Sequence, residues 1–221
     1  MTRFGISFIP CSEVDVLLER CCTTLQQVRE ALAGGAGRVE LCDCIEVGGV
    51  TPSPGLIHDA VATGICVNVL VRPRGGNFVY NAEEVERMKE AIALCRELGV
   101  HGVVIGALTP DGDVDMDVMR ELMDLASAGR RLSVTFHRAF DEASDPFMAF
   151  EDIISLGCDR LLTSGQKPTA PEGRALIRDL ARRAGGRIIV MPGSGVTPDN
   201  VEELAAWCGV SECHGTKLAS K

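Results

Sequence analysis

The chain has 221 residues, 46% hydrophobic and 24% charged, a composition that supports the core of one globular domain and argues against a disordered chain. Its net charge of −9 and the absence of a Lys/Arg cluster argue against nucleic acid or an anionic membrane as a partner and favour small molecules or metal cations. No apolar stretch reaches the roughly 18 residues of a membrane span, and residues 1–15 lack a signal-peptide pattern, so we expect a cytoplasmic protein whose ten cysteines are thiols.

Short β-branched runs alternate with amphipathic helical runs at a nearly constant interval along the chain. The runs with the length and composition of strands are 16–21, 38–42, 67–73, 102–107, 131–137, 160–164, 187–192 and 211–215. This βα repetition, without a Pro/Gly/Ser-rich linker, predicts one α/β domain over residues 1–221 that forms a (β/α)8 TIM barrel. Few residues follow the last run, so we expect the eighth helix to be missing and residues 1–15 to form an N-terminal extension.

The helical runs between the strands carry apolar residues at intervals of three and four. Examples are Val85, Met88, Ile92 and Cys95 in one run and Phe147, Phe150 and Ile154 in another. Several helices are expected to start at a capping residue followed by proline, because proline at the first helical position sacrifices no hydrogen bond. These predicted starts are Ser53-Pro54, Asp145-Pro146 and Thr197-Pro198.

Polar and titratable side chains end several strands on the face expected to line the barrel. In the strand 131–137, Leu132, Val134 and Phe136 form an apolar face toward the helices, which turns the side chain of His137 into the interior. The same alternation in the first three strands places inside the barrel Glu19, Cys21, Glu40, Cys42 and Arg72. These side chains are expected at the rim where barrel enzymes place their chemistry.

Charged groups that face an interior are costly unless paired, so the charged members of this set predict either an ion-pair network or a site that uses their charge. His137, Glu19 and Glu40 are candidates for acid–base catalysis. Arg72 suits recognition of a carboxylate or phosphate, or it pairs with one of the two glutamates.

Two further patterns predict binding rather than proton transfer. Cys21 and Cys42 end two strands in the same Glu-x-Cys pattern, and they are either soft thiolate ligands, as Cu(I) prefers, or small apolar fillers. The loops "TSGQK" and "MPGSGV" follow the sixth and seventh strands, where glycines bring backbone N–H groups toward an anion or serve ordinary tight turns. The candidate anion-binding residues in these loops and after the eighth strand are Ser164, Gly193, Ser194, Gly195 and Thr216.

The motifs "RVELC", "GGVTPS", "RPRGGNFVY", "TFHRAFD", "LLTSG" and "MPGSGV" resemble, in order and spacing, the CutC copper homeostasis family. The resemblance extends from about Leu17 to about Thr216. It implies a (β/α)8 barrel, a cytoplasmic location, a homo-oligomer (dimer or higher), and Cu(I) binding at the positions that match the family's cysteines, Cys21 and Cys42. The chain departs from the family at Val47 and Asn77, where acidic residues are usual.

The same residues support two hypotheses of different class. In the first, the protein serves copper homeostasis and the thiolates of the two cysteines bind Cu(I). In the second, a barrel enzyme acts on a small anionic or phosphorylated substrate, which Arg72 and the "PGSG" loop bind while His137 and one of the glutamates move protons.

Overall fold

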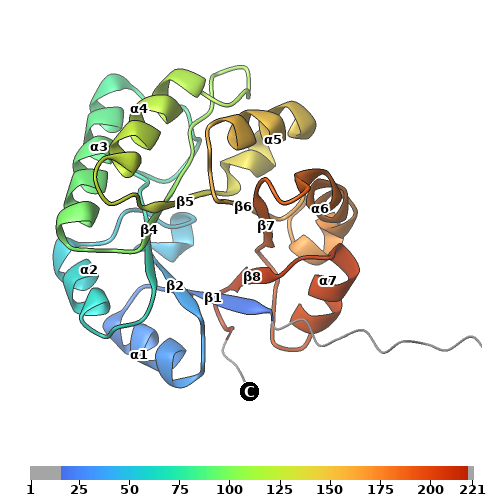
Figure 1. Cartoon of the computed structure of the whole chain (residues 1–221), viewed down its shortest axis with the longest axis horizontal. Coiled ribbons are helices and arrows are strands. Elements are labelled where there is room, and N and C mark those ends of the chain that lie inside the picture. The colour runs from blue at the N-terminus through green and yellow to red at the C-terminus, as the bar shows by residue number, and fades with distance from the viewer. Residues whose placement is uncertain (1–15, 219–221) are drawn as a thin grey trace, which may run out of the picture.

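The structure is a computed structural model that describes residues 16–218. Its parallel strands follow the order β7-β6-β5-β4-β3-β2-β1-β8, and β7 also contacts β8, so the sheet nearly closes into a barrel (Figure 1). The strands are β1 (Leu17–Cys22), β2 (Arg38–Leu41), β3 (Val67–Leu70), β4 (Gly102–Ile105), β5 (Ser133–Phe136), β6 (Arg160–Thr163), β7 (Ile189–Pro192) and β8 (Glu212–Gly215). The predicted (β/α)8 TIM barrel is confirmed, although most strands are shorter than the runs that predicted them.

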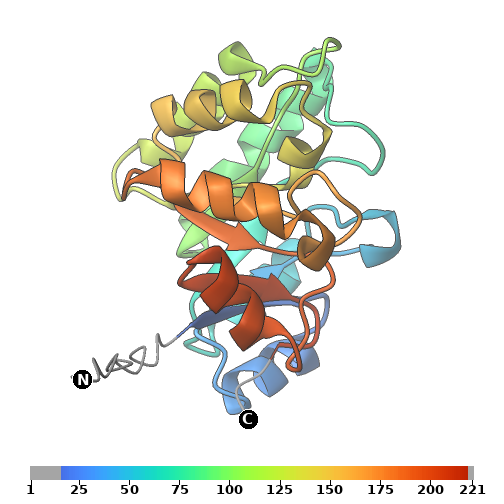
Figure 2. The same cartoon turned by 90° about the vertical axis from the view of Figure 1, so that its right-hand side faces the viewer.

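Helices alternate with the strands and form the outer layer of the barrel, with α6 and α7 side by side (Figure 2). They are α1 (Leu25–Ala33), α2 (Pro54–Val61), α3 (Ala82–Glu97), α4 (Met116–Ser127), α5 (Pro146–Ser155), α6 (Ala170–Ala184) and α7 (Val201–Cys208), with short 3-10 helices η1 (Ile45–Val47) and η2 (Arg138–Glu142). Within residues 16–218 no helix follows β8, and the expected extension 1–15 lies outside the described residues. None of the described helices is long and apolar enough to cross a membrane.

Two of the predicted helix starts are confirmed by their capping hydrogen bonds. α2 begins at Pro54, and the side chain of Ser53 accepts a hydrogen bond from a backbone N–H of the first turn. α5 begins at Pro146, and the carboxylate of Asp145 accepts hydrogen bonds from two N–H groups of its first turn. Local sequence therefore determines where these helices begin.

The predicted helix start at Thr197-Pro198 is wrong, since α7 begins at Val201. The side chain of Asn200 accepts a hydrogen bond from the Thr197 N–H at 2.9 Å and donates one to the carbonyl of Gly195 at 3.0 Å. These two bonds hold the segment before Val201 in a turn, so the helix starts three residues later than the Thr-Pro pair predicts.

The predicted apolar faces are confirmed in α3 and rotated in α5. In α3 all four predicted residues are buried, namely Val85, Met88, Ile92 and Cys95. In α5 the buried residues are Ala149, Phe150 and Ile153, whereas Phe147 is 38% exposed. The guanidinium of Arg183 in α6 lies 4.2 Å from the Phe147 ring centroid and covers it instead.

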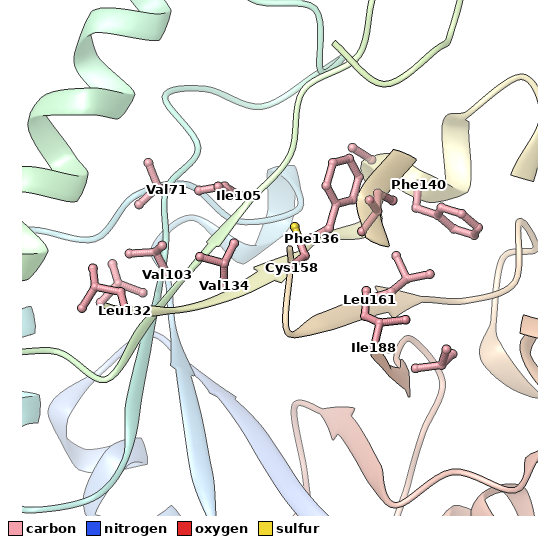
Figure 3. Packing of buried hydrophobic residues seen from close by; sticks show 14 of the residues in the cluster. Val71, Val103, Ile105, Leu132, Val134, Phe136, Phe140, Cys158, Leu161 and Ile188 are labelled. Atoms are coloured by element: carbon pink, nitrogen blue, oxygen red, sulfur yellow. The ribbon is translucent and has the colours of Figure 1, made fainter. Parts of the chain in front are cut away.

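The apolar core lies between the strands and the helices (Figure 3). Its fully buried residues within the strands and directly next to them include Val71, Val103, Ile105, Leu132, Val134, Phe136 and Leu161. Burying one such side chain contributes about 1.5–3 kcal/mol. Because this face of each strand packs against helices, the alternate residues point into the barrel, as the period-two pattern predicts.

Buried ion pairs join the strand ends opposite the cavity described below. Arg38 of β2 pairs with the carboxylate of Glu19 of β1, and its Nη2 lies 2.5 Å from Oε2 of Glu212 of β8. Arg160 of β6 approaches the same Glu212 oxygen at 2.7 Å through its Nε. Since a buried charge is tolerated only when it is paired, this network ties four strands together beneath the cavity.

Candidate functional site

A cavity of about 950 Å³ opens at the C-terminal ends of the strands. The residues predicted for the site that line it are Cys21, Glu40, Cys42, Arg72, His137, Ser194, Gly195 and Thr216. The predicted residues that are buried without lining it are Glu19, Ser164 and Gly193. The barrel thus brings the candidate metal ligands and the candidate anion-binding residues into one cavity.

The two candidate thiol ligands lie side by side in this cavity. Sγ of Cys21 is 3.3 Å from Sγ of Cys42, and the residues are 6% and 0% exposed. The loop after β2 passes close to the pair, since even a Cβ atom added to Gly49 would lie only 3.7 Å from Sγ of Cys42. The hydrogen bond between the thiols and their burial raise the pKa of Cys21 far above its usual range, so this thiol is protonated at neutral pH.

Glu40 of β2 and His214 of β8 lie beside the thiols. One ligand atom each of Cys21, Glu40 and His214 lies within 4.8 Å of the other two. Sequence reasoning missed His214, although its signal is present in the strand. The alternation that turns Cys213 into the apolar core turns Glu212 and His214 into the barrel.

The surroundings of Glu19, Glu40 and His214 shift the pKa values of these side chains in different directions. Nδ1 of His214 lies 2.9 Å from Oε1 of Glu19 and 3.8 Å from Oε2 of Glu40. Burial alone would raise the pKa of Glu19, but the hydrogen bond from His214 and the charge of Arg38 lower it to about 2.

Glu40 is the member of this group that titrates near neutral pH. Burial raises the pKa of Glu40 to about 7, even though the charge of His214 opposes the shift. Its Oε2 has no hydrogen-bond partner in the described part of the chain. Burial alone would lower the pKa of His214, but the charge of Glu40 and the hydrogen bond with Glu19 raise it above its ordinary value.

His137 follows β5 and lines the cavity, as its position in the strand predicts. Its Nδ1 accepts a hydrogen bond from the Ala139 N–H at 3.2 Å, which places the ring proton on Nε2. A Cβ on Gly106 would lie 2.6 Å from this Nδ1, so the glycine leaves room for the ring. Burial and the charge of Arg72 lower the pKa of His137 to about 3, so the imidazole is neutral and keeps one N–H donor, on the buried Nε2.

Arg72 spans the loops at the rim and pairs with neither of the predicted glutamates. Its guanidinium donates to the carbonyls of Val47 at 3.1 Å, Gly49 at 2.9 Å and Gly76 at 2.7 Å. It also lies 4.7 Å from the ring centroid of Phe78. Arg72 therefore holds the loops after β2 and β3 together, and no carboxylate in residues 16–218 neutralises its charge.

The carboxylate of Asp141, the last residue of "TFHRAFD", organises the loop after β6. It accepts hydrogen bonds from the Thr163 hydroxyl at 2.6 Å and from the N–H groups of Ser164 and Gln166, each at 3.0 Å. Arg138 pairs with the same carboxylate at 2.8 Å. The N–H of Ser164 is therefore already occupied by Asp141 within the protein.

The match to known proteins covers nearly the whole described chain. Residues 16–219 match the sequence profile of the CutC family. The chain belongs to the CutC family. The family resemblance of the six motifs is thereby confirmed.

The CutC relatives extend over most of this chain at high identity. A CutC family protein from Parabacteroides distasonis is 52% identical over 200 residues, which are 90% of this chain and 81% of that protein. One from Chromobacterium violaceum is 49% identical over 206 residues, 92% of this chain and 81% of that protein. A solved CutC structure from Streptococcus agalactiae, whose name assigns it to copper homeostasis, has a TM-score of 0.86 at 36% identity and covers 91% of this chain and 99% of that one.

Replacing Glu40 of this CutC family member with glutamine is expected to stabilise the fold by about 3 kcal/mol at about pH 8 and to change little at about pH 4. The folded-state pKa of about 7 lies above the ordinary 4.5, so the folded protein holds this proton more tightly than the unfolded chain. Ionised Glu40 therefore lowers stability progressively as the pH rises from 4.5 through about 7.

Urea unfolding at the two pH values measures this effect, and Glu46→Gln, in the exposed 3-10 helix after β2, is the matched control. A Glu40→Gln variant less stable than the parent at the higher pH would contradict burial as the dominant influence on Glu40.

Proposed function

We propose that this CutC family member serves copper homeostasis by binding Cu(I) through the thiolates of Cys21 and Cys42. The observation that carries the proposal is the pair of buried thiols, 3.3 Å apart, at the wall of an open cavity. Thiolates are soft ligands that select Cu(I) over harder cations. The name of the Streptococcus agalactiae relative supports a role with copper. The copper ion is the proposed partner. From the family resemblance we also propose a cytoplasmic homo-oligomer, and light scattering would measure its mass.

The distance between the two sulfurs favours a bent arrangement with a third ligand. Two metal–thiolate bonds of about 2.3 Å in line would separate the sulfurs by roughly 4.6 Å, well beyond the observed 3.3 Å. A bent S–Cu–S arrangement needs a smaller distance between the two sulfurs and leaves a coordination position of the copper ion open. His214 or Glu40 can fill that position, because their ligand atoms lie within 4.8 Å of the Cys21 sulfur.

Copper binding is expected to strengthen as the pH rises. The metal binds a thiolate, whereas the Cys21 thiol is protonated in the metal-free protein because the hydrogen bond with Cys42 and burial raise its pKa. Binding therefore releases at least one proton, and the dissociation constant should fall about tenfold per pH unit for each proton released.

An anaerobic titration of the reduced protein with Cu(I), against a competing chelator at several pH values, tests the proposal. We expect one tight equivalent per chain and an X-ray absorption spectrum with two sulfur neighbours and one nitrogen or oxygen neighbour. Zn(II) offered in competition should bind more weakly than Cu(I). The absence of a tight equivalent, or copper bound without sulfur neighbours, would contradict the proposal.

A second candidate function, acid–base catalysis in the same cavity, is favoured by the state of Glu40. Its Oε2 is unpaired within the described residues and its pKa is about 7, which suits a group that exchanges protons near neutral pH. In this role Glu19 would position His214, while Arg72 and His137 would orient the substrate. A reaction of this protein that Glu40→Gln fails to slow would exclude Glu40 as its acid or base.

A further inference from the structure

Backbone N–H groups without acceptors line one side of the cavity, in the loop after β7. Ser194 and Gly195 have φ angles of 70° and 72°, and successive turn residues of this kind gather N–H groups into an anion-binding concavity. The N–H groups of Ser194, Gly195 and Val196 donate to no acceptor among the residues that the structure describes. The Ser194 hydroxyl donates to the carbonyl of Pro168 at 2.9 Å, which fixes the loop.

The loop after β8 lies against the loop after β7. A Cβ on Gly215 would lie 2.9 Å from the carbonyl oxygen of Val196, so glycine permits the close approach. Thr216 and Lys217 line the cavity beside these loops, and the Thr216 N–H likewise has no acceptor between residues 16 and 218. In barrels of this architecture the loops after the seventh and eighth strands often form a phosphate site.

The charges around the cavity favour an anion, although the chain as a whole carries −9. The cationic side chains that line it are Arg72, Arg138, Lys167 and Lys217, and the carboxylates are Glu40, Asp141 and Glu142. Arg138 and Asp141 neutralise each other at 2.8 Å. Lys167 and Lys217 are exposed and form no ion pair within the described chain. The remaining positive charge is available to a ligand.

His137 adds an unpaired buried donor at this cavity, independently of the loops. Its Nε2–H is a donor without an acceptor in residues 16–218, and the residue is only 4% exposed. A buried donor left without a partner costs about 1–3 kcal/mol. Because Nδ1 is occupied by the Ala139 N–H, the side chain cannot satisfy Nε2 by exchanging its tautomer. An oxygen atom of a bound ligand would supply the missing acceptor.

We propose that the barrel mouth binds a small phosphate monoester, with its phosphate group on the N–H groups of residues 194–196 and Thr216. Lys167 and Lys217 stabilise the phosphate charge, and the Nε2–H of His137 donates to an oxygen of the ligand. The cavity of about 950 Å³ has the size of a small-molecule site and exceeds the volume of a phosphate ion, so the ligand carries an organic part. None of these groups is a proposed copper ligand, and the proposal does not depend on copper binding.

Isothermal titration calorimetry on the metal-free, reduced full chain tests this site with inorganic phosphate, glycerol 3-phosphate and unphosphorylated glycerol. We expect glycerol 3-phosphate to bind more tightly than inorganic phosphate, and glycerol not to bind at millimolar concentrations. The double variant Lys167→Met/Lys217→Met should weaken binding of both anions by at least about tenfold. Both lysines are exposed, so the variant should fold. Lys89→Met in α3 is the control for loss of a lysine outside the cavity, although this lysine is half-buried and pairs with Glu86 and Glu121.

His137→Phe provides the second readout, because phenylalanine lacks the N–H donor. It should weaken glycerol 3-phosphate binding more than inorganic phosphate binding, since this donor contacts the organic part of the ligand. If neither glycerol 3-phosphate nor inorganic phosphate binds at millimolar concentrations, the proposed site is wrong. Anion binding that survives in the double lysine variant would also overturn it. Inorganic phosphate that binds as tightly as glycerol 3-phosphate would overturn the assignment of an ester as the ligand.

Discussion

Serine at both Cys21 and Cys42 is expected to weaken Cu(I) binding by about ten-thousand-fold. Structural zinc sites with four ligands bind with about 10–16 kcal/mol, or about 3 kcal/mol per ligand. Removing both thiolates should therefore remove about 6 kcal/mol, and about 1.4 kcal/mol corresponds to a factor of ten. A serine hydroxyl is a hard oxygen ligand and cannot replace a soft thiolate for Cu(I). The competition titration with a Cu(I) chelator measures the loss.

The matched control for this variant is Cys95→Ser/Cys158→Ser. It removes the same number of thiols, and these cysteines are 0% and 3% exposed in the core between strands and helices, outside the cavity. The control should keep the tight equivalent, and urea unfolding of both variants checks that each is folded. Binding that falls less than tenfold in the Cys21/Cys42 variant would reassign the two cysteines to packing.

Replacing Arg38 with methionine is expected to destabilise the protein by about 3–5 kcal/mol. The substitution keeps much of the side-chain volume and removes the charge that pairs with Glu19 and Glu212, whose side chains are 0% and 8% exposed. Glu212 still pairs with Arg160 in the variant. Most of the lost stability therefore arises at Glu19, which loses Arg38 and keeps only its contact with His214. The free energy of unfolding in urea measures the change.

The exposed pair of Arg187 and Glu151 provides the comparison for Arg38. These side chains approach to 2.6 Å but are 46% and 55% exposed, so Arg187→Met should cost less than about 1 kcal/mol. Added salt should weaken the exposed pair more than the buried network. If Arg38→Met proves no more costly than Arg187→Met, the buried network contributes little net stability and hydrophobic side chains could replace it.

The sequence by itself determined the barrel and the face of each strand residue. The orientation of a strand side chain depends on the local backbone, which alternates with a period of two. The same rule that turned Val134 outward turned His137 inward, and it placed Cys21 and Cys42 in the interior. Helix starts with a local cap, such as Ser53-Pro54, were equally readable, since their hydrogen bonds lie within one turn.

Only the tertiary structure decided which partner each of these side chains meets. His214 and Glu19 are separated by 195 positions in sequence, and the pairing of β8 with β1 brings them to 2.9 Å. Arg72 donates to loop carbonyls rather than to a glutamate because the loops after β2 and β3 pass over the rim. Such contacts depend on how strands and loops far apart in sequence meet when the barrel closes, and no local pattern of residues encodes that arrangement.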